Sequence, residues 1–241
     1  MTHRECDFLA VQPKVEAGHK VALQTFDKSK YVTNNTIHHM YRQPAFARKR
    51  LTRDETRERI MIKADELFRQ FGFVKTTVAD MAAELGMSPA NIYKFFSSKE
   101  AIIQASADRN LVVLSEAVHR HMVESGAALD RIEKVLLTVY RHTVDILRNE
   151  RQVFKLMIRA YEQKWDCVGA FDQFLLQALA KLVKEGMRIG EFKSGDALAT
   201  AHLLFDCLIL IRTPHLYQQE GRELNEKRIR GMVRFLGRAL K

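Results

Sequence analysis

The chain has 241 residues, and 46% of them are hydrophobic, which is enough to bury a substantial core and argues against a wholly disordered protein. Its formal charge of +10 favours a polyanionic partner, either nucleic acid or an anionic membrane surface. We expect a cytoplasmic protein, because the sequence shows no signal peptide, no apolar run of the roughly 18 to 20 residues that span a membrane, and only three scattered cysteines.

Residues 1–47 are expected to be a disordered extension that ends in a basic arm. Residues 1–39 show neither helical nor strand periodicity, so we expect them to be dispensable, and Met40 is a candidate for the true start. The stretch from residue 42 to 53 is rich in arginine and lysine and contains no acid. It is either a solvated linker or an arm whose Arg48, Lys49 and Arg50 contact DNA.

The first predicted helix begins with a capping box. Thr52 and Glu55 have the spacing of an N-cap residue and its N3 partner, and Gly72 is a typical C-terminal stop. The apolar residues between them recur at helical spacing and should form the buried face: Ile60, Ala64, Leu67, Phe68 and Phe71.

Two short helices should follow, joined by a tight turn. Thr77 and Asp80 form a second capping box, which opens a helix that Gly86 ends. Ser88 is a good N-cap and Pro89 suits the first helical position, so the next helix should run over 89–96.

Long helices should make up the rest of the chain, which predicts an all-α protein. A third box, Ser97 with Glu100, should open a helix that continues to about Val123. Breaks are expected at Gly190, near Gly195 and near Pro214, and no strand or repeat is evident. The later helices are expected at about 129–148, 150–164, 168–189, 196–212 and 223–240.

The pair of short helices has the spacing of a helix-turn-helix. Such a unit is either a plain helical corner or a DNA reader. DNA binding is favoured because the second helix carries Asn91, Tyr93 and Lys94, whose side chains reach bases or phosphates.

The stretch Gly72-Phe73 through TTVADMAAELGMSPANIYKFFSSKEAI resembles the DNA-binding domain of the TetR family of transcriptional regulators. The resemblance covers about residues 50–105 and rests on the Thr-rich entry, Ala82, Gly86, Tyr93, Phe96 and Lys99. It implies a helix-turn-helix domain over 48–105, and a helical ligand-binding and dimerisation domain over 106–241. It also implies a homodimeric repressor that a small-molecule inducer releases from operator DNA.

Phosphate contacts are expected from residues around the motif. Lys99 lies in the first turn of a helix, where the macrodipole disfavours a cation, so a DNA phosphate would explain it better than solvent exposure. The resemblance gives Lys99 and Tyr93 this role, although Tyr93 is also compatible with a half-buried ring. Thr76 and Thr77 are either caps only, or one of them caps while the other donates to a phosphate.

Base reading should fall to the N-terminal face of the second short helix, which Ser88 and Pro89 begin. The amide of Asn91 can pair with adenine, and the ammonium of Lys94 can donate to guanine. The small apolar side chain of Ala90 can contact a thymine methyl group. The operator sequence does not follow from these residues.

An aromatic and sulfur-rich set on three consecutive helices is either core or the lining of an inducer pocket. Nearby, Arg141, His142 and Arg159 are either ligands for an acidic effector or surface charges. The set consists of Tyr140, Phe154, Met157, Tyr161, Trp165, Phe171 and Phe174.

The last two helices are expected to form the dimer surface. Residues 197–211 are apolar around nearly the whole helix, so the segment should be covered on both sides. His202 and Asp206 are expected to form a buried hydrogen-bonded pair. Gly231 and Gly237 would permit close approach of a second helix.

Other classes of function have less support. The sequence lacks the common catalytic motifs and any metal-ligand spacing, so we expect neither an enzyme nor a bound metal or cofactor. A constitutive regulator or activator without an inducer stays open, as does a helical adaptor that has lost DNA binding. Retention of Tyr93, Lys94 and Lys99 argues against the adaptor.

Overall fold

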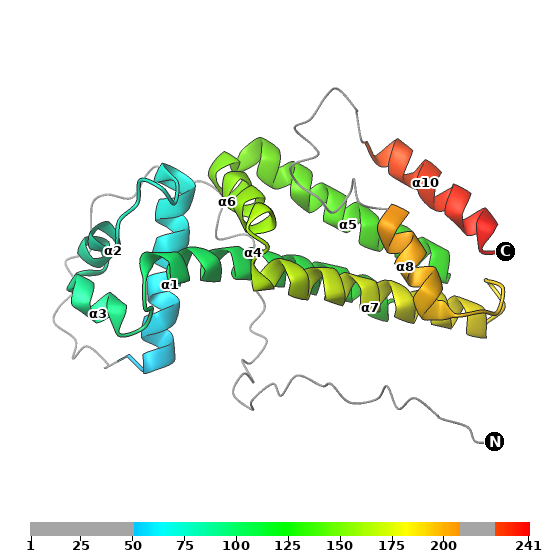
Figure 1. The fold of residues 1–241 in the computed structure, drawn as a ribbon, viewed down its shortest axis with the longest axis horizontal. Helices are drawn as coiled ribbons and strands as arrows, with labels where there is room; N and C mark the ends of the chain where they lie inside the picture. The colour runs from blue at the N-terminus through cyan, green and yellow to red at the C-terminus, as the bar shows by residue number, and fades with distance from the viewer. Residues whose placement is uncertain (1–50, 208–224) are drawn as a thin grey trace, which may run out of the picture. The chain divides into compact units, whose positions relative to one another are not determined.

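The computed structural model describes residues 51–207 and 225–241, which form helices with no strand among them (Figure 1). The all-α prediction is therefore confirmed for these residues. The predictions on residues 1–50, which include Arg48, Lys49 and Arg50, and on the break near Pro214 lie outside the described ranges. The helices are α1 (Arg53–Phe71), α2 (Val78–Leu85), α3 (Pro89–Tyr93), α4 (Lys99–Val123), α5 (Ala128–Asn149), α6 (Arg151–Glu162), α7 (Asp166–Arg188), α8 (Ala197–Cys207) and α10 (Glu226–Ala239).

The predicted cap of α1 is present in both directions. The backbone N–H of Glu55 donates to Thr52 Oγ1 at 3.1 Å, and that of Thr52 donates to Glu55 Oε2 at 2.7 Å. The expected apolar face is buried except at Phe71, which is 50% exposed, so this assignment was wrong. Gly72 has φ 83°, and a Cβ there would lie 2.9 Å from Gln152 Oε1 of α6. The end of α1 therefore requires glycine for its conformation, whereas the end of the flexible Gln152 side chain can move away.

The predicted cap of α2 is also present, with Thr77 and Asp80 paired and Gly86 left-handed at φ 64°. The next helix, α3, is shorter than predicted and ends at Tyr93 instead of residue 96. The amides of Phe95 and Phe96 both donate to the Ile92 carbonyl, at 2.9 and 3.1 Å. This tight turn ends the helix and directs the Phe96 ring into the core.

The start of α4 differs from the prediction by one residue. Ser98, and not Ser97, is the N-cap, and its Oγ accepts from the Ala101 amide at 3.1 Å. The predicted box of Ser97 with Glu100 does not form. Glu100 instead pairs with Arg159 of α6, so a long-range ion pair outcompetes the local cap.

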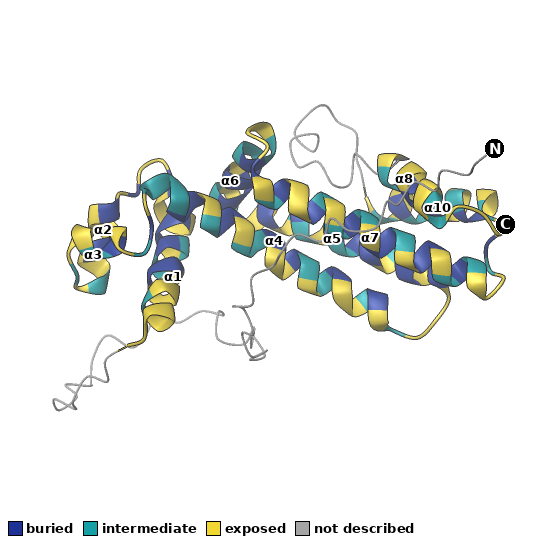
Figure 2. Cartoon of the chain, turned by 60° about the horizontal axis from the view of Figure 1, so that its bottom comes forward, coloured by how far each residue is buried: buried dark blue, intermediate teal, exposed yellow. Residues whose placement is uncertain are grey.

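The C-terminal helices share one continuous core. Helix α7 packs against α4, α5 and α8, while α10 packs on α5. Figure 2 shows that the buried positions of these helices face one another. Two helix ends are capped by side chains from other segments. Glu191 accepts from the first two amides of α5, and Arg131 donates to the last carbonyls of α4. None of the described helices is long and apolar enough to cross a membrane.

Candidate functional site

The helix-turn-helix presents a compact exposed surface. Most residues predicted to contact DNA are exposed on α3 or in the segments that flank α2 and α3: Thr77, Ser88, Pro89, Ala90, Tyr93 and Lys94. The Tyr93 ring is 50% exposed. The Ser88 side chain makes no capping hydrogen bond, so its hydroxyl is available to a ligand.

Asn91 is less accessible than its neighbours on α3. Its side chain is half-buried, and Nδ2 donates to the sulfur of Met87 at 3.8 Å. Sulfur is a weak acceptor, so little free energy holds the amide in this position. The residue can therefore turn toward a base edge at small cost.

Thr76 requires a correction. Its side chain is 2% exposed, and its hydroxyl donates to the carbonyls of Gly72 at 3.0 Å and Leu67 at 3.3 Å. The hydroxyl is thus used to join the end of α1 to the turn before α2. We do not carry Thr76 forward as a contact to DNA.

Lys99 has a partner inside the chain. Its Nζ donates to the carbonyl of Val74 at 3.0 Å, which ties the start of α4 to the loop before α2. The amide and hydroxyl of Thr77 donate to Asp80 and hold the pKa of that carboxyl below its usual value, and the nearby charge of Lys99 adds to this effect. An ammonium has three donors, so Lys99 keeps capacity for a phosphate.

Arg57 and Lys75 were missed by sequence reasoning. Arg57 of α1 is exposed, and its guanidinium lies over the Phe96 ring, 4.7 Å from the centroid. Lys75 is exposed in the turn that precedes Thr77. In the described ranges no carboxylate pairs with either cation. The signal available in the sequence was the position of Arg57 on the polar face of the helix that precedes the predicted DNA reader.

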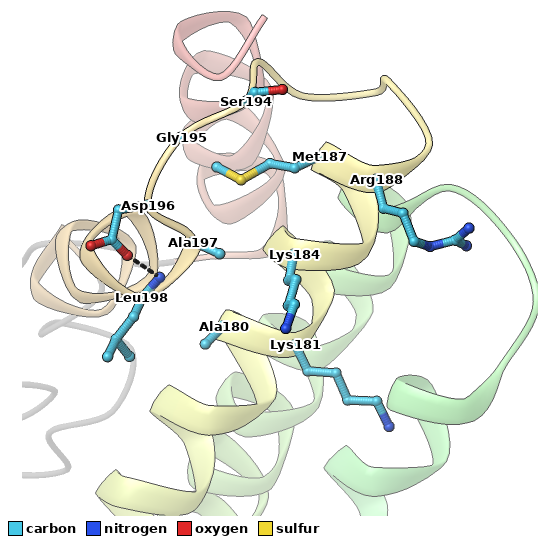
Figure 3. A pocket seen from close by; sticks show the side chains of 10 residues that line it. All are labelled: Ala180, Lys181, Lys184, Met187, Arg188, Ser194, Gly195, Asp196, Ala197 and Leu198. Atoms are coloured by element: carbon cyan, nitrogen blue, oxygen red, sulfur yellow. Dashed lines mark hydrogen bonds between the residues drawn. The ribbon is translucent and has the colours of Figure 1, made fainter. Parts of the chain in front are cut away.

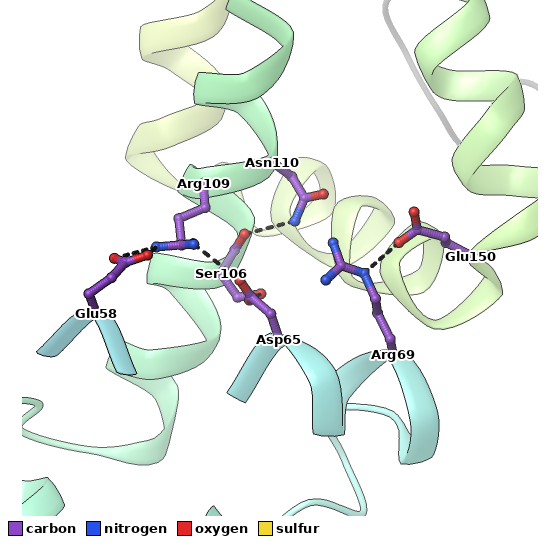
Figure 4. A network of polar contacts seen from close by, with 7 residues as sticks. All are labelled: Glu58, Asp65, Arg69, Ser106, Arg109, Asn110 and Glu150. Atoms are coloured by element: carbon purple, nitrogen blue, oxygen red, sulfur yellow. Dashed lines mark hydrogen bonds and ion pairs between the residues drawn. The ribbon is translucent and has the colours of Figure 1, made fainter. Parts of the chain in front are cut away.

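Two polar clusters join α1, α4 and α6. In the first, Asp65 accepts from Ser106 Oγ at 2.5 Å and pairs with Arg109 Nε at 3.1 Å, and Arg109 also binds Glu58 (Figure 4). Asp65 is largely buried, and this burial raises the pKa of its carboxyl, although Ser106 and Arg109 act in the opposite direction. The first cluster therefore connects α1 to α4.

The second cluster connects α1 and α4 to α6. Arg69 of α1 donates to Glu150 at 2.7 Å, at the start of α6. At the other end of α6, Arg159 donates to both carboxylate oxygens of Glu100 at 3.1 Å. The Arg159 guanidinium also lies 5.4 Å from the Phe73 ring and 5.6 Å from the Trp165 ring.

The predicted pocket residues all belong to the hydrophobic core or pack against it. Tyr140, Phe154, Met157, Trp165 and Phe171 are buried, while Tyr161 and Phe174 are partly buried against the same core. Of the nearby cations, Arg141 pairs with Glu226 of α10 at 2.8 Å. Arg159 pairs with Glu100 as described above. A groove lies elsewhere, between α7 and the start of α8 (Figure 3).

Two family models match the chain. Residues 60–106 match the bacterial regulatory proteins of the tetR family, and residues 128–233 match the tetracyclin repressor-like C-terminal domain. The first match covers the helix-turn-helix, and the second covers the helices behind it. The chain belongs to the TetR family. It is thus a DNA-binding transcriptional regulator.

Relatives in sequence and in structure agree with this assignment. The HTH-type transcriptional regulator TtgR of Pseudomonas putida is 27% identical over 170 residues, which is 64% of this chain and 79% of TtgR. The uncharacterized HTH-type regulator YfiR of Bacillus subtilis is 27% identical over 64% of this chain and 76% of its own length. A TetR/AcrR-family regulator from Thermobifida fusca has a similar structure, with a TM-score of 0.58 and 25% identity over 77% of this chain and 98% of its own.

The last helices of this TetR-family chain leave apolar side chains exposed. Leu203 of α8 is 69% exposed and Phe235 of α10 is 72% exposed. His202 and Asp206 are exposed and form no hydrogen-bonded pair in this chain, so that expectation was wrong. Residues 208–211 of the predicted apolar segment lie outside the described residues.

Proposed function

We propose that this regulator represses transcription by holding operator DNA, and that a small apolar or aromatic effector releases it. One observation supports this most strongly. Arg159 connects Trp165, in the aromatic set, to Glu100, in the first turn of the helix that follows α3. An effector that displaces Trp165 would therefore move a side chain that holds the DNA-binding unit.

The proposed DNA contacts come from the exposed residues of the helix-turn-helix. Tyr93 and Lys99 would bind phosphates, and the exposed Thr77 would do so if its hydroxyl turned away from Asp80. Ala90, Asn91 and Lys94 would read bases. Ser88 and Pro89 would bring the start of α3 close to the DNA. Arg48, Lys49 and Arg50 would follow the backbone or enter the minor groove.

The switch requires an effector with different affinities for two conformations. A difference of about 5.5 kcal/mol would move the population from 1:99 to 99:1. Since Arg69 with Glu150 and Arg159 with Glu100 lie at the two ends of α6, we propose that α6 transmits the change. The released state would hold the two reading helices of a dimer at a spacing that misfits the operator.

Trp165 gives a direct test because it is the only tryptophan in the chain. We expect that a compound which changes Trp165 fluorescence also weakens operator binding. In Glu100→Gln, which removes the ion pair with Arg159, the compound should still bind and change the fluorescence but should release operator less effectively. If a compound fills this region in a bound structure and operator affinity does not change, repression relieved by an effector is wrong and constitutive regulation is the better account.

The adaptor alternative is tested separately, with random duplex DNA at low salt. A regulator of the proposed type should bind such DNA through phosphate contacts, and added salt should weaken that binding. An adaptor that has lost DNA binding would show no retention at any salt concentration. The proposal also places the protein in the cytoplasm, where it would meet operator DNA.

We further propose a homodimer that uses α8 and α10. Leu204 of α8 and Val233 of α10 line one small apolar space, so the two helices lie together, with Leu203 and Phe235 exposed. Gly237 allows close packing within the chain itself, because a Cβ there would lie 2.4 Å from the Leu129 side chain. A Cβ at Gly231 would meet nothing within 4 Å, so close approach of a second copy would explain this glycine better.

Gly231→Leu tests this interface. The isolated helix should become more stable, because glycine is a poor helix former, but the added side chain should block the partner and weaken the dimer at least about tenfold. Analytical ultracentrifugation measures the dissociation constant. Gly169→Leu on α7 is the matched control, since a Cβ at Gly169 also meets nothing within 4 Å. Equal dimer affinity in both variants and the native chain would place the interface elsewhere.

A further inference from the structure

The groove between the second half of α7 and the start of α8 has the size of a ligand site. Its volume is about 680 Å³, within the range of about 300 to 1,000 Å³ that small-molecule sites occupy. Part of its lining is apolar, and Leu198 is 53% exposed there. In Figure 3, Met187 extends from α7 toward the loop that leads into α8.

Three cations of α7 border the same groove. Lys181, Lys184 and Arg188 are spaced by three and four residues, so they lie along one side of the helix, and all are exposed. No carboxylate in the described ranges pairs with them. The C-terminal macrodipole of α7 explains Arg188 in the last turn but not Lys181, which lies about two turns earlier.

The acids nearest to this groove along the chain each have a partner within the chain, and one of them, Asp196, lines the groove. Glu185 pairs with the buried guanidinium of Arg131 at 2.9 Å. Glu191 accepts from the first amides of α5, at 2.6 and 2.9 Å. Asp196 accepts from the first amides of α8, at 2.9 and 3.0 Å. The lining therefore holds three cations, Lys181, Lys184 and Arg188, against the one carboxylate of Asp196, which leaves a net charge of +2.

We propose that this groove binds a small anionic amphiphile, in which a carboxylate is joined to an apolar chain. The carboxylate would lie against Lys181 and Lys184, and the chain would cover Met187, Ala197 and Leu198. Charge-assisted hydrogen bonds would hold the anionic end, and burial of apolar surface would hold the rest. The site is separate from the aromatic set around Trp165, so it stands independently of the proposed inducer pocket.

Decanoate, below its micellar concentration, and decanol are suitable probes because they share the chain and differ in charge. Calorimetric titration of the full-length protein at low ionic strength should show decanoate bound about tenfold more tightly than decanol. Added salt should weaken decanoate binding and leave decanol unaffected. Absence of decanoate binding, or equal affinity for both compounds, would overturn the proposal.

Charge reversal locates the site. The double variant Lys181→Glu with Lys184→Glu should weaken decanoate binding at least about tenfold and leave decanol binding unchanged. The milder double variant Lys181→Gln with Lys184→Gln should have an affinity for decanoate between those of the native chain and the charge-reversed variant. The control is Arg151→Glu with Lys155→Glu, which reverses two exposed cations of α6 and alters the net charge equally. If this control weakens binding as much, or if the groove variants bind normally, decanoate does not occupy the groove.

Discussion

At the scale of single residues, Arg57 illustrates how a packed aromatic ring can orient a charge for a ligand. The guanidinium lies over Phe96, whose own position is fixed by the turn that ends α3. A cation held in this way loses little conformational entropy when it binds a phosphate. We therefore expect Arg57 to contribute to DNA binding through a phosphate contact that does not depend on the base sequence.

Arg57→Ala should weaken binding to all duplex sequences alike. It should also lower the slope of log affinity against log salt by about one unit, because one phosphate contact is lost. Fluorescence anisotropy with two unrelated duplexes measures both effects. Arg148→Ala, an exposed arginine of α5, is the control. A slope unchanged in Arg57→Ala, or lowered equally in the control, would remove Arg57 from the interface.

Asp65 should give stability a measurable pH dependence. Burial raises the pKa of its carboxyl above 3.8, so the folded state binds the proton more tightly than the unfolded state. The stability contributed by the protonated form is fully present below 3.8 and is lost as the pH rises through the raised pKa. Melting curves should thus show the native chain losing stability relative to Asp65→Asn over this rise. A relative gain would mean that the ion pair with Arg109 outweighs burial.

At the scale of helices, substitution of the two serines before α4 tests which of them caps the helix. Ser98→Ala removes the bond to the Ala101 amide and should lower the free energy of unfolding by about 1 kcal/mol. Ser97→Ala is the matched control and should change it by less than about 0.5 kcal/mol. Denaturant titration measures both. A larger loss of stability in Ser97→Ala than in Ser98→Ala would support the capping box of Ser97 with Glu100 that the sequence predicts.

Helix boundaries set by neighbouring residues were more predictable than those set by distant contacts. Thr52 and Thr77 act through partners three residues away, so a local pattern was sufficient to find both caps. The end of α3 and the cap of α4 depend on contacts between distant segments: Phe96 enters the core, and Glu100 pairs with Arg159 across 59 residues. A pattern in the local sequence holds no information on either contact.

The candidate site was predictable to a similar extent. The exposed residues of α3 followed from helical periodicity and the resemblance to known regulators. Thr76 and Thr77 could not be separated, because their positions relative to α1 decide which hydroxyl is buried. Arg57 is far from the motif in sequence and meets it only through folding.

At the scale of the whole molecule, the central claim is that α2 and α3 read a specific operator. Two copies related by a twofold axis would place their α3 helices in successive major grooves, about 34 to 36 Å apart. The bound site should then be a palindrome whose half-sites are separated by about 10 to 10.5 base pairs or a multiple of that distance. Asn91→Ala should change the preferred half-site without altering this spacing.

Sequencing of the fragments that the protein retains from a random duplex library tests this claim most directly. The expected result is enrichment of one palindromic site over successive rounds, with the enriched half-site altered in Asn91→Ala. Retained fragments with no common sequence, or with a common sequence that Asn91→Ala and Lys94→Ala both leave unchanged, would contradict the assignment of α3 as the reading helix.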